Sequence, residues 1–352
     1  MREESLEFLK VLVETGAPSG YEQPVQSLFR DYVQPYSESV RIDVMGNAIA
    51  ALNPDGQPRV MLAGHADEIG FLVRHINDEG YLYFGPVGGW DAEIVVGQRV
   101  TVHTRSGPLR GTIGKRAIHL LDEEERRKKS ELHTLWIDVG LSGREAVAQR
   151  VAIGDPVTIH VPFDRLANEL AVAKSFDNRM AVFVCAETLR LLHGKKIAAG
   201  VYSVSTVQEE IGLRGARTAS FGVDPQIGIA IDVTHATDYP DADKRKVGDI
   251  RIGGGPVITR GANINPRVFE RLVQAAEEES IPYQVEATPG GTGTDANAMQ
   301  LNKAGMATGL VSVALRYMHT PCEVLSLTDL ENGCRLCAAF IERLRADQDW
   351  TP

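Results

Sequence analysis

The sequence has few cysteines, few tryptophans and no long apolar segment. Its 352 residues include four cysteines and three tryptophans. Four cysteines are too few for a disulfide scaffold in a chain of this length. No run reaches the roughly 18 uninterrupted apolar residues of a membrane-spanning helix. The N-terminus, Met1–Ser5, is charged and lacks the apolar core of a signal peptide, so we expect a cytoplasmic protein.

The chain also lacks an excess of basic residues. Its 37 Lys and Arg residues stand against 47 Asp and Glu residues, which gives a formal net charge of −10. An acidic protein is poorly suited to nucleic acid or an anionic membrane, so we expect neither as a partner. A hydrophobic content of 43% and a charged content of 24% are ordinary for a globular protein.

The pattern of secondary structure changes twice along the chain. Residues 69–165 contain short β-rich segments separated by turns, which predicts a small inserted β domain. Residues 166–352 alternate strands and helices, which predicts a largely parallel sheet covered by helices on both faces. We therefore expect one larger domain formed by residues 1–68 and 166–352, interrupted by the insertion.

Three local patterns have structural explanations. The break at Gly16–Gly20 separates two N-terminal helices, and Ser19 is expected to cap the second. Asp122–Lys129 places four acids before four bases, with every acid-to-base pair at i,i+4. This favours a solvated helical segment over a partner-binding one. Cys334 and Cys337 form a CxxC without a second pair, so neither a redox nor a zinc role is favoured.

Five short polar motifs, far apart in the sequence, carry the chemistry. They are Gly64–Glu68, Ser175–Asn178, Gln208–Gly212, Ile231–Val233 and Met318–Pro321. Most follow apolar runs that predict buried strands, and ligands of parallel sheets bind beyond the carboxyl ends of strands. Buried carboxylates and imidazoles are costly unless they are paired or bind metal. The set indicates a metallohydrolase with two divalent ions.

The first two motifs also have simpler explanations. Val60–Gly64 predicts a strand that delivers His65, and Asp67 follows on the same side, where a carboxylate orients a metal-bound imidazole. His65 at a strand end could equally make only a local hydrogen bond. Asp177 precedes an apolar helix, so by itself it is explained as an N-cap.

The other three motifs are harder to explain without a metal. Glu209 and Glu210 follow an apolar strand, and adjacent residues of an extended chain point in opposite directions. One of them can bind metal while the other acts as a general base. Asp232 ends the apolar run 227–231, where an unpaired acid would be expensive. His319 lies just before Pro321, which biases Thr320 toward extended geometry.

Together these motifs resemble the tetrahedral (TET) aminopeptidases, dinuclear metallo-aminopeptidases of peptidase family M forty-two, which includes glutamyl aminopeptidases and proteins labelled as cellulases. The resemblance covers essentially the whole chain. The segments that carry it are Gly64–Phe71, Gly97–Val100, Trp136–Gly140, Asp177–Arg179 and Gln208–Ala216. It implies an α/β catalytic domain, with a mixed, largely parallel sheet between helices. The 69–165 insertion would be a PDZ-like dimerisation domain, and dimers would assemble into a hollow tetrahedral dodecamer.

The resemblance also implies a ligand set. Asp177 would bridge both metals, His65 and Asp232 would complete one site, and Glu210 and His319 would complete the other. Imidazole and carboxylate ligands without thiolate suit Zn²⁺, Co²⁺ or Mn²⁺, and the sequence does not choose among them.

The remaining roles concern catalysis. By resemblance Glu209 would be the general base, Asp67 would orient His65, and the peptide bond between Asp177 and Asn178 would be cis. A water activated by the two metals would attack the first peptide bond of a short peptide with a free N-terminus.

The substrate pocket is the least constrained part of the site. The Gly-rich loop Thr288–Asp295, with Thr292 and Gly293, would lie near the pocket for the first side chain. It lacks the Lys-Ser/Thr ending of a P-loop, which disfavours nucleotide binding. Arg260 could reach an acidic substrate, but we expect a neutral aliphatic preference.

Three alternatives are weighed against this interpretation. Related di-metal carboxypeptidases and N-acyl amino-acid deacylases carry a lid inserted after the bridging Asp, whereas the insertion here precedes Asp177. An endoglucanase needs two carboxylates and normally no metal, so two histidine ligands would have no purpose. A non-enzymatic shell would have an incomplete ligand set, and this set is complete.

Overall fold

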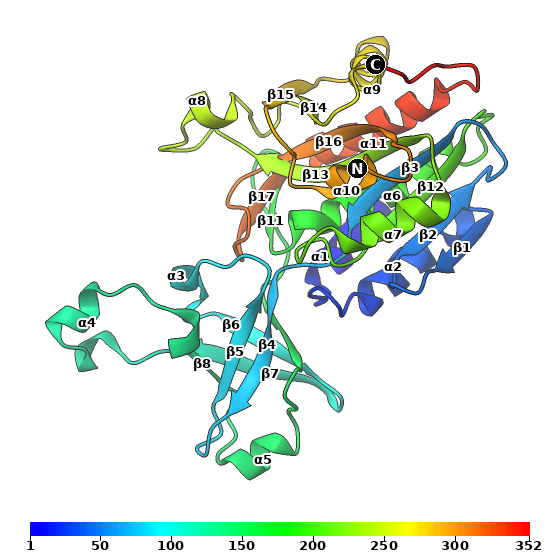
Figure 1. The fold of residues 1–352 in the computed structure, drawn as a ribbon. Coiled ribbons are helices and arrows are strands. Elements are labelled where there is room, and N and C mark those ends of the chain that lie inside the picture. Colours follow the sequence, from blue (N-terminus) through cyan, green and yellow to red (C-terminus); the bar gives the residue numbers. More distant parts are fainter.

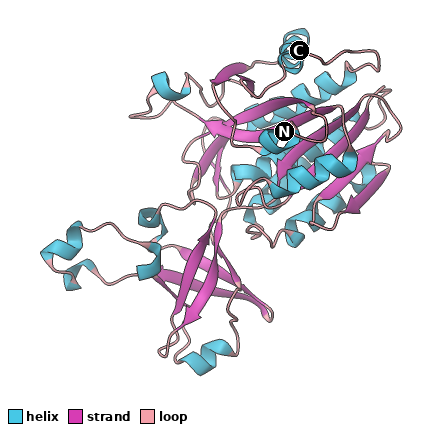
Figure 2. Cartoon of the chain, in the orientation of Figure 1, coloured by secondary structure: helices cyan, strands magenta, loops and turns pink.

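A long mixed sheet and a small closed barrel form the two lobes of the chain (Figure 1). The structure is a computed structural model, and it describes residues 1–352. Helices cover both faces of the large sheet, whereas the barrel carries only short helices at its periphery (Figure 2). This is the expected α/β architecture with a small β-rich insertion.

The large sheet has eight strands. In spatial order they are β1 (Ser39–Ile42), β2 (Ala48–Leu52), β12 (Gly200–Thr206), β3 (Arg59–His65), β13 (Ile227–His235), β16 (Ala307–Leu315), β14 (Val257–Gly261) and β15 (Gln284–Thr288). The central strands β12, β3, β13 and β16 are mutually parallel, and antiparallel pairs flank them on both sides. These four strands are almost continuously buried, as a sheet covered on both faces requires.

Helices pack on the sheet in two unequal layers. The larger core joins one face to α1 (Glu3–Glu14), α2 (Gln23–Val33), α6 (Phe176–Leu192), α9 (Pro266–Glu278) and α11 (Leu327–Glu342). The smaller core joins the other face to α7 (Arg214–Val223) and α10 (Asp295–Met299). None of the helices combines the length and apolarity that crossing a bilayer requires.

The barrel has its own hydrophobic core of 15 buried residues. Its strands are β4 (Gly70–Ile76), β5 (Leu82–Val87), β8 (Trp136–Asp138), β7 (Gly107–Gly114), β6 (Arg99–Thr104) and β9 (Pro156–Ile159). The short helices around it are α3 (Ala92–Val95), η2 (Ile118–Leu120), α4 (Glu123–Arg127), η3 (Leu132–Thr134) and α5 (Arg144–Ala148). All of these elements lie inside the 69–165 segment.

The charged segment of the insertion forms a shorter helix than its charge pattern predicts. α4 ends at Arg127 and begins with a capping box made by Asp122 and Glu125. Two of the expected i,i+4 pairs form, one of them between Arg127 and Glu123. Glu125 instead pairs with Arg116 of the preceding loop, because the capping box turns its carboxylate away from Lys129.

Several elements have no counterpart in the sequence prediction. A three-stranded sheet of β10 (Asp164–Arg165), β11 (Leu170–Ala173) and β17 (Glu323–Ser326) places residues that are far apart in the sequence side by side. Strand β14, which lies between β16 and β15, and the short helices η1 (Gln34–Tyr36) and α8 (Lys244–Val247) were also not expected. Conversely, α10 ends at Met299 and does not run on to Lys303.

Ser19 does not cap the second helix. The N-cap position of α2 is Glu22, and no side chain caps that helix. The Ser19 hydroxyl is buried and donates elsewhere, to Asp67. The correction has a simple cause, because the loop turns inward at residues 17–19 before the helix begins.

Candidate metal centre

Neighbouring parallel strands bring the predicted residues to one edge of the sheet. His65 ends β3, and Glu209 and Glu210 lie in the loop after β12, the strand next to it. Asp177 lies in the first turn of α6, and His319 follows β16. The carboxyl ends of parallel strands meet at one edge, which explains why residues distant in sequence converge here.

Asp232 reaches the same edge in a different way from the one expected. The strand that carries it does not end there, because β13 continues to His235 beside β16. Its pairing with β3 on the other side stops at Ala230. Asp232 is therefore buried just beyond the point where β3 leaves its neighbour.

The carboxylate of Asp177 lies between the two imidazoles. Its Oδ1 is 3.3 Å from Nε2 of His65, and its Oδ2 is 3.3 Å from Nε2 of His319. The Nε2 atom of His319 is also 3.4 Å from Oε1 of Glu210. The peptide bond between Asp177 and Asn178 is cis, as the resemblance implies.

The donor atoms form two groups that share His65. One consists of His65, Asp177 and Glu210, the other of His65, Glu209 and Asp232, and within each group the donor atoms lie within 4.8 Å of one another. Donors bound about 2.0–2.2 Å from a tetrahedral cation lie roughly 3.3–3.6 Å apart. The distances around Asp177 match that separation, so the residues fit a pair of divalent cations bridged by one carboxylate.

The electrostatics of the cluster fit a cation as well. The pKa of Glu209 is raised to about 10, because burial and the nearby Asp232 together outweigh the opposing effect of His65. Burial also raises the pKa of Asp232 well above its ordinary value. By contrast, hydrogen bonds to His319 and His65 outweigh burial and lower the pKa of Asp177. Positive charge between these carboxylates would relieve their repulsion.

Asp67 connects two parts of the cluster. Its Oδ1 is 3.5 Å from Nδ1 of His65, which is closer, at 3.1 Å, to the backbone oxygen of Asp67. The carboxylate accepts hydrogen bonds from the backbone N–H groups of Glu209 (3.0 Å) and Glu210 (3.1 Å) and from Ser19 Oγ (2.6 Å). Asp67 thus lies beside His65 and also binds the turn that carries both glutamates, a contact that the sequence pattern did not reveal.

A second buried cluster lies next to Asp67. Glu68 accepts from Lys174 Nζ at 2.7 Å, from Ser175 Oγ at 2.6 Å and from the Ala17 N–H at 3.0 Å. The fully buried guanidinium of Arg179 donates to the carbonyl of Ala17 and contacts Glu68. Every charge has a partner, as buried ions require. The cluster ties the 15–19 loop to the start of α6.

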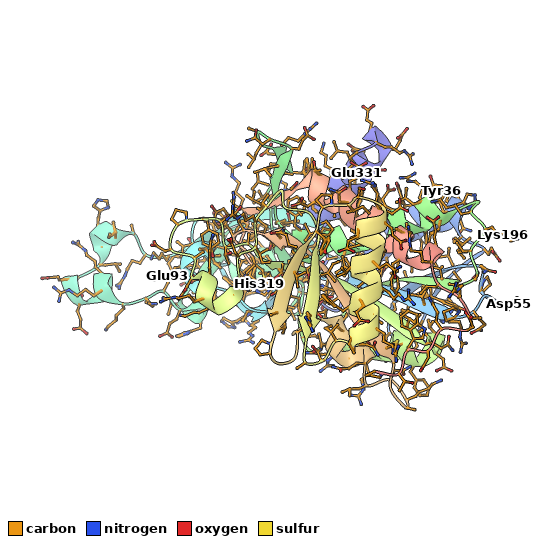
Figure 3. The ribbon with its side chains drawn as sticks, turned by 90° about the horizontal axis from the view of Figure 1, so that it is seen from above. Tyr36, Asp55, Glu93, Lys196, His319 and Glu331 are labelled. Atoms are coloured by element: carbon orange, nitrogen blue, oxygen red, sulfur yellow. The ribbon has the colours of Figure 1, made fainter.

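The inserted barrel forms a wall of the site. A Cβ on Gly88 would lie 2.5 Å from Ile69 Cγ2 and 3.2 Å from Oε2 of Glu210. A Cβ on Gly89 would lie 3.4 Å from Nδ1 of His319. Figure 3 shows His319 between Glu93 of the insertion and the labelled residues at the far end of the catalytic lobe. The site therefore lies at the junction of the two lobes.

The three residues predicted to bind substrate, Thr292, Gly293 and Arg260, do not all lie in the same part of the structure. Thr292 lies in the Gly-rich loop, where its N–H and hydroxyl both donate to Asn297 Oδ1, and Gly293 adopts φ +73°. Asp295 fastens the loop to the strand before the glutamates, because its Oδ2 accepts from Thr206 at 2.6 Å. The guanidinium of Arg260 lies 5.6 Å from the ring centroid of Phe269 on α9.

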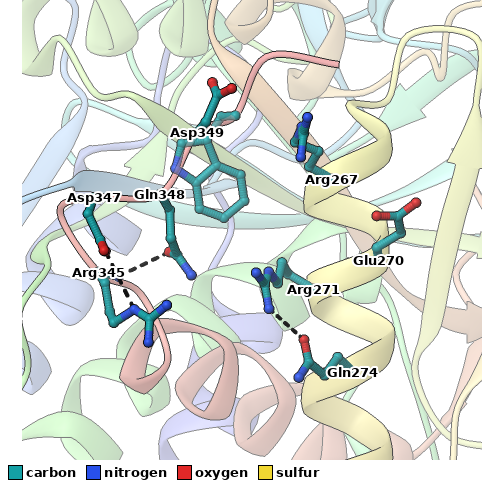
Figure 4. Close-up of a pocket in the computed structure, with 9 residues that line it drawn as sticks. Arg267, Glu270, Arg271, Gln274, Arg345, Asp347, Gln348 and Asp349 are labelled. Atoms are coloured by element: carbon teal, nitrogen blue, oxygen red, sulfur yellow. Dashed lines mark hydrogen bonds and ion pairs between the residues drawn. The ribbon is translucent and has the colours of Figure 1, made fainter.

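A groove of about 420 Å³ between α9 and the C-terminal tail contains none of the predicted site residues (Figure 4). Two of its arginines are already engaged. Arg345 Nε lies 3.5 Å from Oδ1 of Asp347, and Arg271 donates to Gln274 at 2.7 Å.

Comparisons with known proteins identify the family of this chain. Residues 46–336 match the family model described as M42 glutamyl aminopeptidase. The chain is 38% identical over 349 residues to a lysyl aminopeptidase of Pyrococcus furiosus, covering 98% of this chain and 99% of that protein.

Two solved structures have the same fold over nearly their whole length. A TET aminopeptidase from a marine sediment Thaumarchaeota archaeon superposes with a TM-score of 0.92 at 34% identity, covering 97% of both chains. The TET1 peptidase of Pyrococcus horikoshii is described as assembling into a tetrahedron or a large octahedral shell. It superposes with a TM-score of 0.87 at 30% identity, covering 97% of this chain and 100% of that one. This chain is a peptide-bond hydrolase and belongs to the M42 glutamyl aminopeptidase family.

Proposed function

We propose that this protein is a dinuclear metal-dependent aminopeptidase that removes the first residue from short peptides with a free N-terminus. The observation that carries the proposal is the placement of Asp177. Each of its carboxylate oxygens faces a different imidazole at 3.3 Å, His65 on one side and His319 on the other. This is the arrangement expected of a carboxylate that bridges two cations.

The residues divide into two ligand groups around that bridge. His65 and Asp232 would hold one cation, and Glu210 and His319 would hold the other. The donor set is imidazole and carboxylate, which suits Zn²⁺, Co²⁺ or Mn²⁺. When bound, two such cations lower the pKa of a water molecule and polarise the peptide carbonyl.

Glu209 is proposed as the general base. Its Oε2 is 3.7 Å from Nε2 of His65, and its side chain is nearly buried beside the ligands. Glu209 Oε2 would accept a proton from the attacking water and return it to the nitrogen of the leaving amine. Asp67, through the backbone N–H of Glu209, holds this carboxylate in place.

The substrate pocket is proposed to include Thr292 and Gly293 of the Gly-rich loop. The loop is pinned at its end to β12, the strand that leads to Glu209, through Asp295 and Thr206. Relatives are named for lysyl and glutamyl residues, so a charged first residue has to be tested beside the neutral aliphatic one that we expect. The cation–π contact of Arg260 with Phe269 favours a structural role for that arginine.

We also propose that the chain assembles into a homo-oligomer, with the inserted barrel as a dimerisation domain and a tetrahedral dodecamer as the final particle. Support comes from the Pyrococcus horikoshii relative, which is described as forming a tetrahedron or a larger octahedral shell. Light scattering coupled to size-exclusion chromatography distinguishes a dimer, a dodecamer and a larger shell by mass.

The test of the activity uses metal-stripped protein and a panel of aminoacyl-p-nitroanilides, including leucyl, lysyl and glutamyl substrates. Zn²⁺, Co²⁺ or Mn²⁺ is added back separately, and an N-acetylated substrate is the control. Cleavage restored by metal and confined to free-amine substrates is the expected result. Cleavage of the blocked substrate would favour a deacylase, and metal-independent hydrolysis of a glucan would favour an endoglucanase.

A further inference from the structure

One buried carboxylate outside the predicted ligand set joins two of the proposed ligands through their backbones. Oε2 of Glu323 accepts a hydrogen bond of 3.0 Å from the N–H of Asp177. Oε1 of the same residue accepts one of 3.0 Å from the N–H of His319. Glu323 is only 2% exposed, so water does not compete for these bonds.

Both ligands lie in irregular backbone that needs such support. Asp177 and Asn178 have non-helical dihedral angles at the start of α6. His319 has φ +59° in the loop between β16 and β17. Regular helix or sheet bonding cannot fix the spacing of two such residues, whereas the two oxygens of one carboxylate can.

Glu323 is itself firmly held. It is the first residue of β17, and it pairs with Ala173 of β11. The next residue, Val324, exchanges two backbone hydrogen bonds of 3.0 and 3.1 Å with Arg316. The Glu323 carboxylate therefore connects the three-stranded sheet to the backbones of Asp177 and His319.

We propose that Glu323 is a positioning residue that sets the separation of Asp177 and His319 and so determines the affinity for one of the two cations. The inference rests on the proposed dinuclear site. The cation held by Glu210 and His319 depends on Glu323 twice, through His319 and through the bridging Asp177. The cation held by His65 and Asp232 depends on it only through Asp177.

The test measures metal binding rather than turnover. Metal-stripped wild type and Glu323→Gln are titrated with Co²⁺ by calorimetry and visible absorption. An amide has one acceptor oxygen and a donor nitrogen, so Glu323→Gln keeps the volume but loses one of the two bonds. We expect one of the two Co²⁺ constants to weaken about 10- to 100-fold, and the other to change much less.

Asp329→Asn is the matched control. Asp329 also accepts two backbone N–H groups, those of Gly253 (2.6 Å) and Gly255 (2.9 Å), but away from the ligands. The Asp329→Asn variant should have a lower midpoint of thermal unfolding and unchanged binding constants for both Co²⁺ ions. If folded Glu323→Gln binds both ions as tightly as wild type, the inference is wrong while the proposed site stands. If wild type itself binds no Co²⁺ pair, the proposed function fails first.

A measurement on the wild type decides the question if the variant does not fold. Hydrogen exchange of the metal-free protein, resolved to single residues by fragmentation mass spectrometry, reports the two N–H groups directly. Slow exchange of the N–H groups of Asp177 and His319 supports the proposed role of Glu323, because both groups donate to its buried carboxylate. Rapid exchange at both positions would overturn it.

Discussion

Ser19 and Asp67 are joined by a buried hydrogen bond of 2.6 Å from Ser19 Oγ to Asp67 Oδ2, although 48 residues separate them in the sequence. The same carboxylate accepts the backbone N–H groups of Glu209 and Glu210 and lies beside His65. A loop of the N-terminal helical region is therefore connected through Asp67 to the turn that carries Glu209 and Glu210.

Replacing Ser19 by Ala should lower kcat/KM by about 10- to 100-fold, because removing a partner of a ligand-orienting group typically costs that much. Ser19→Thr keeps the hydroxyl, so its kcat/KM should fall much less. The measurement is steady-state cleavage of an aminoacyl-p-nitroanilide. Ser37→Ala removes a hydroxyl that donates to Val33 far from the ligands and serves as the control. Equal activity of Ser19→Ala and wild type would show that the bond is only structural.

Replacing Glu209 by Gln should lower kcat by about 10²- to 10⁴-fold, the usual contribution of a general acid–base residue. Both cations should remain bound, because Glu209 is not among the proposed ligands. Calorimetric metal titration beside the assay separates the two effects. Loss of one cation together with activity would instead make Glu209 a ligand, and retained turnover would remove the base assignment.

Gly88→Ala tests whether the inserted barrel forms part of the active site. The added methyl group would clash with Ile69 at 2.5 Å and press on Oε2 of Glu210 at 3.2 Å. We expect at least about a tenfold loss of activity, because a small misplacement at a reacting centre is costly. Gly140→Ala is the control, since Gly140 has a nearly identical φ (+73° against +74°) with open space around it. Similar losses in both variants would point to backbone strain alone.

The ion pair of Asp238 and Arg316 predicts a pH-dependent stability. Burial raises the pKa of Asp238, but two hydrogen bonds from Arg316, of 2.8 and 2.7 Å, outweigh it and lower the pKa overall. A carboxylate whose pKa is lower in the folded state stabilises the protein above its unfolded pKa of about 4. That stabilisation is lost as the pH falls through the folded value.

Asp238→Asn should therefore reduce the free energy of unfolding at pH 7 by about 1–2 kcal/mol. The difference from wild type should shrink as the pH falls below about 4. Urea unfolding of both proteins at several pH values measures this difference in the free energy of unfolding. Asp243→Asn breaks a pair with the highly exposed Arg245 and should change stability little. A difference that stays constant from neutral to acidic pH would contradict the assignment.

Much of the fold was readable from local patterns. Apolar runs such as 227–231, between turn residues, predict buried strands, and their alternation with helices predicts a parallel sheet. The change to short β segments at residue 69 predicts the insertion. The short strand β14 and the three-stranded sheet were missed, because short strands gain their stability from neighbours that a local pattern does not identify.

The sequence by itself determined the residue types: carboxylates such as Glu209 and Asp232 follow apolar runs, where burying them is costly, whereas His65 and Asp177 also have local explanations. Only the tertiary structure decided what holds them in place. Ser19 contacts Asp67 across 48 positions of the chain, Gly88 lies against Glu210, and Glu323 contacts Asp177 across 146 positions. Such contacts leave no periodicity or spacing in the chain, because they form only when separate elements pack against one another.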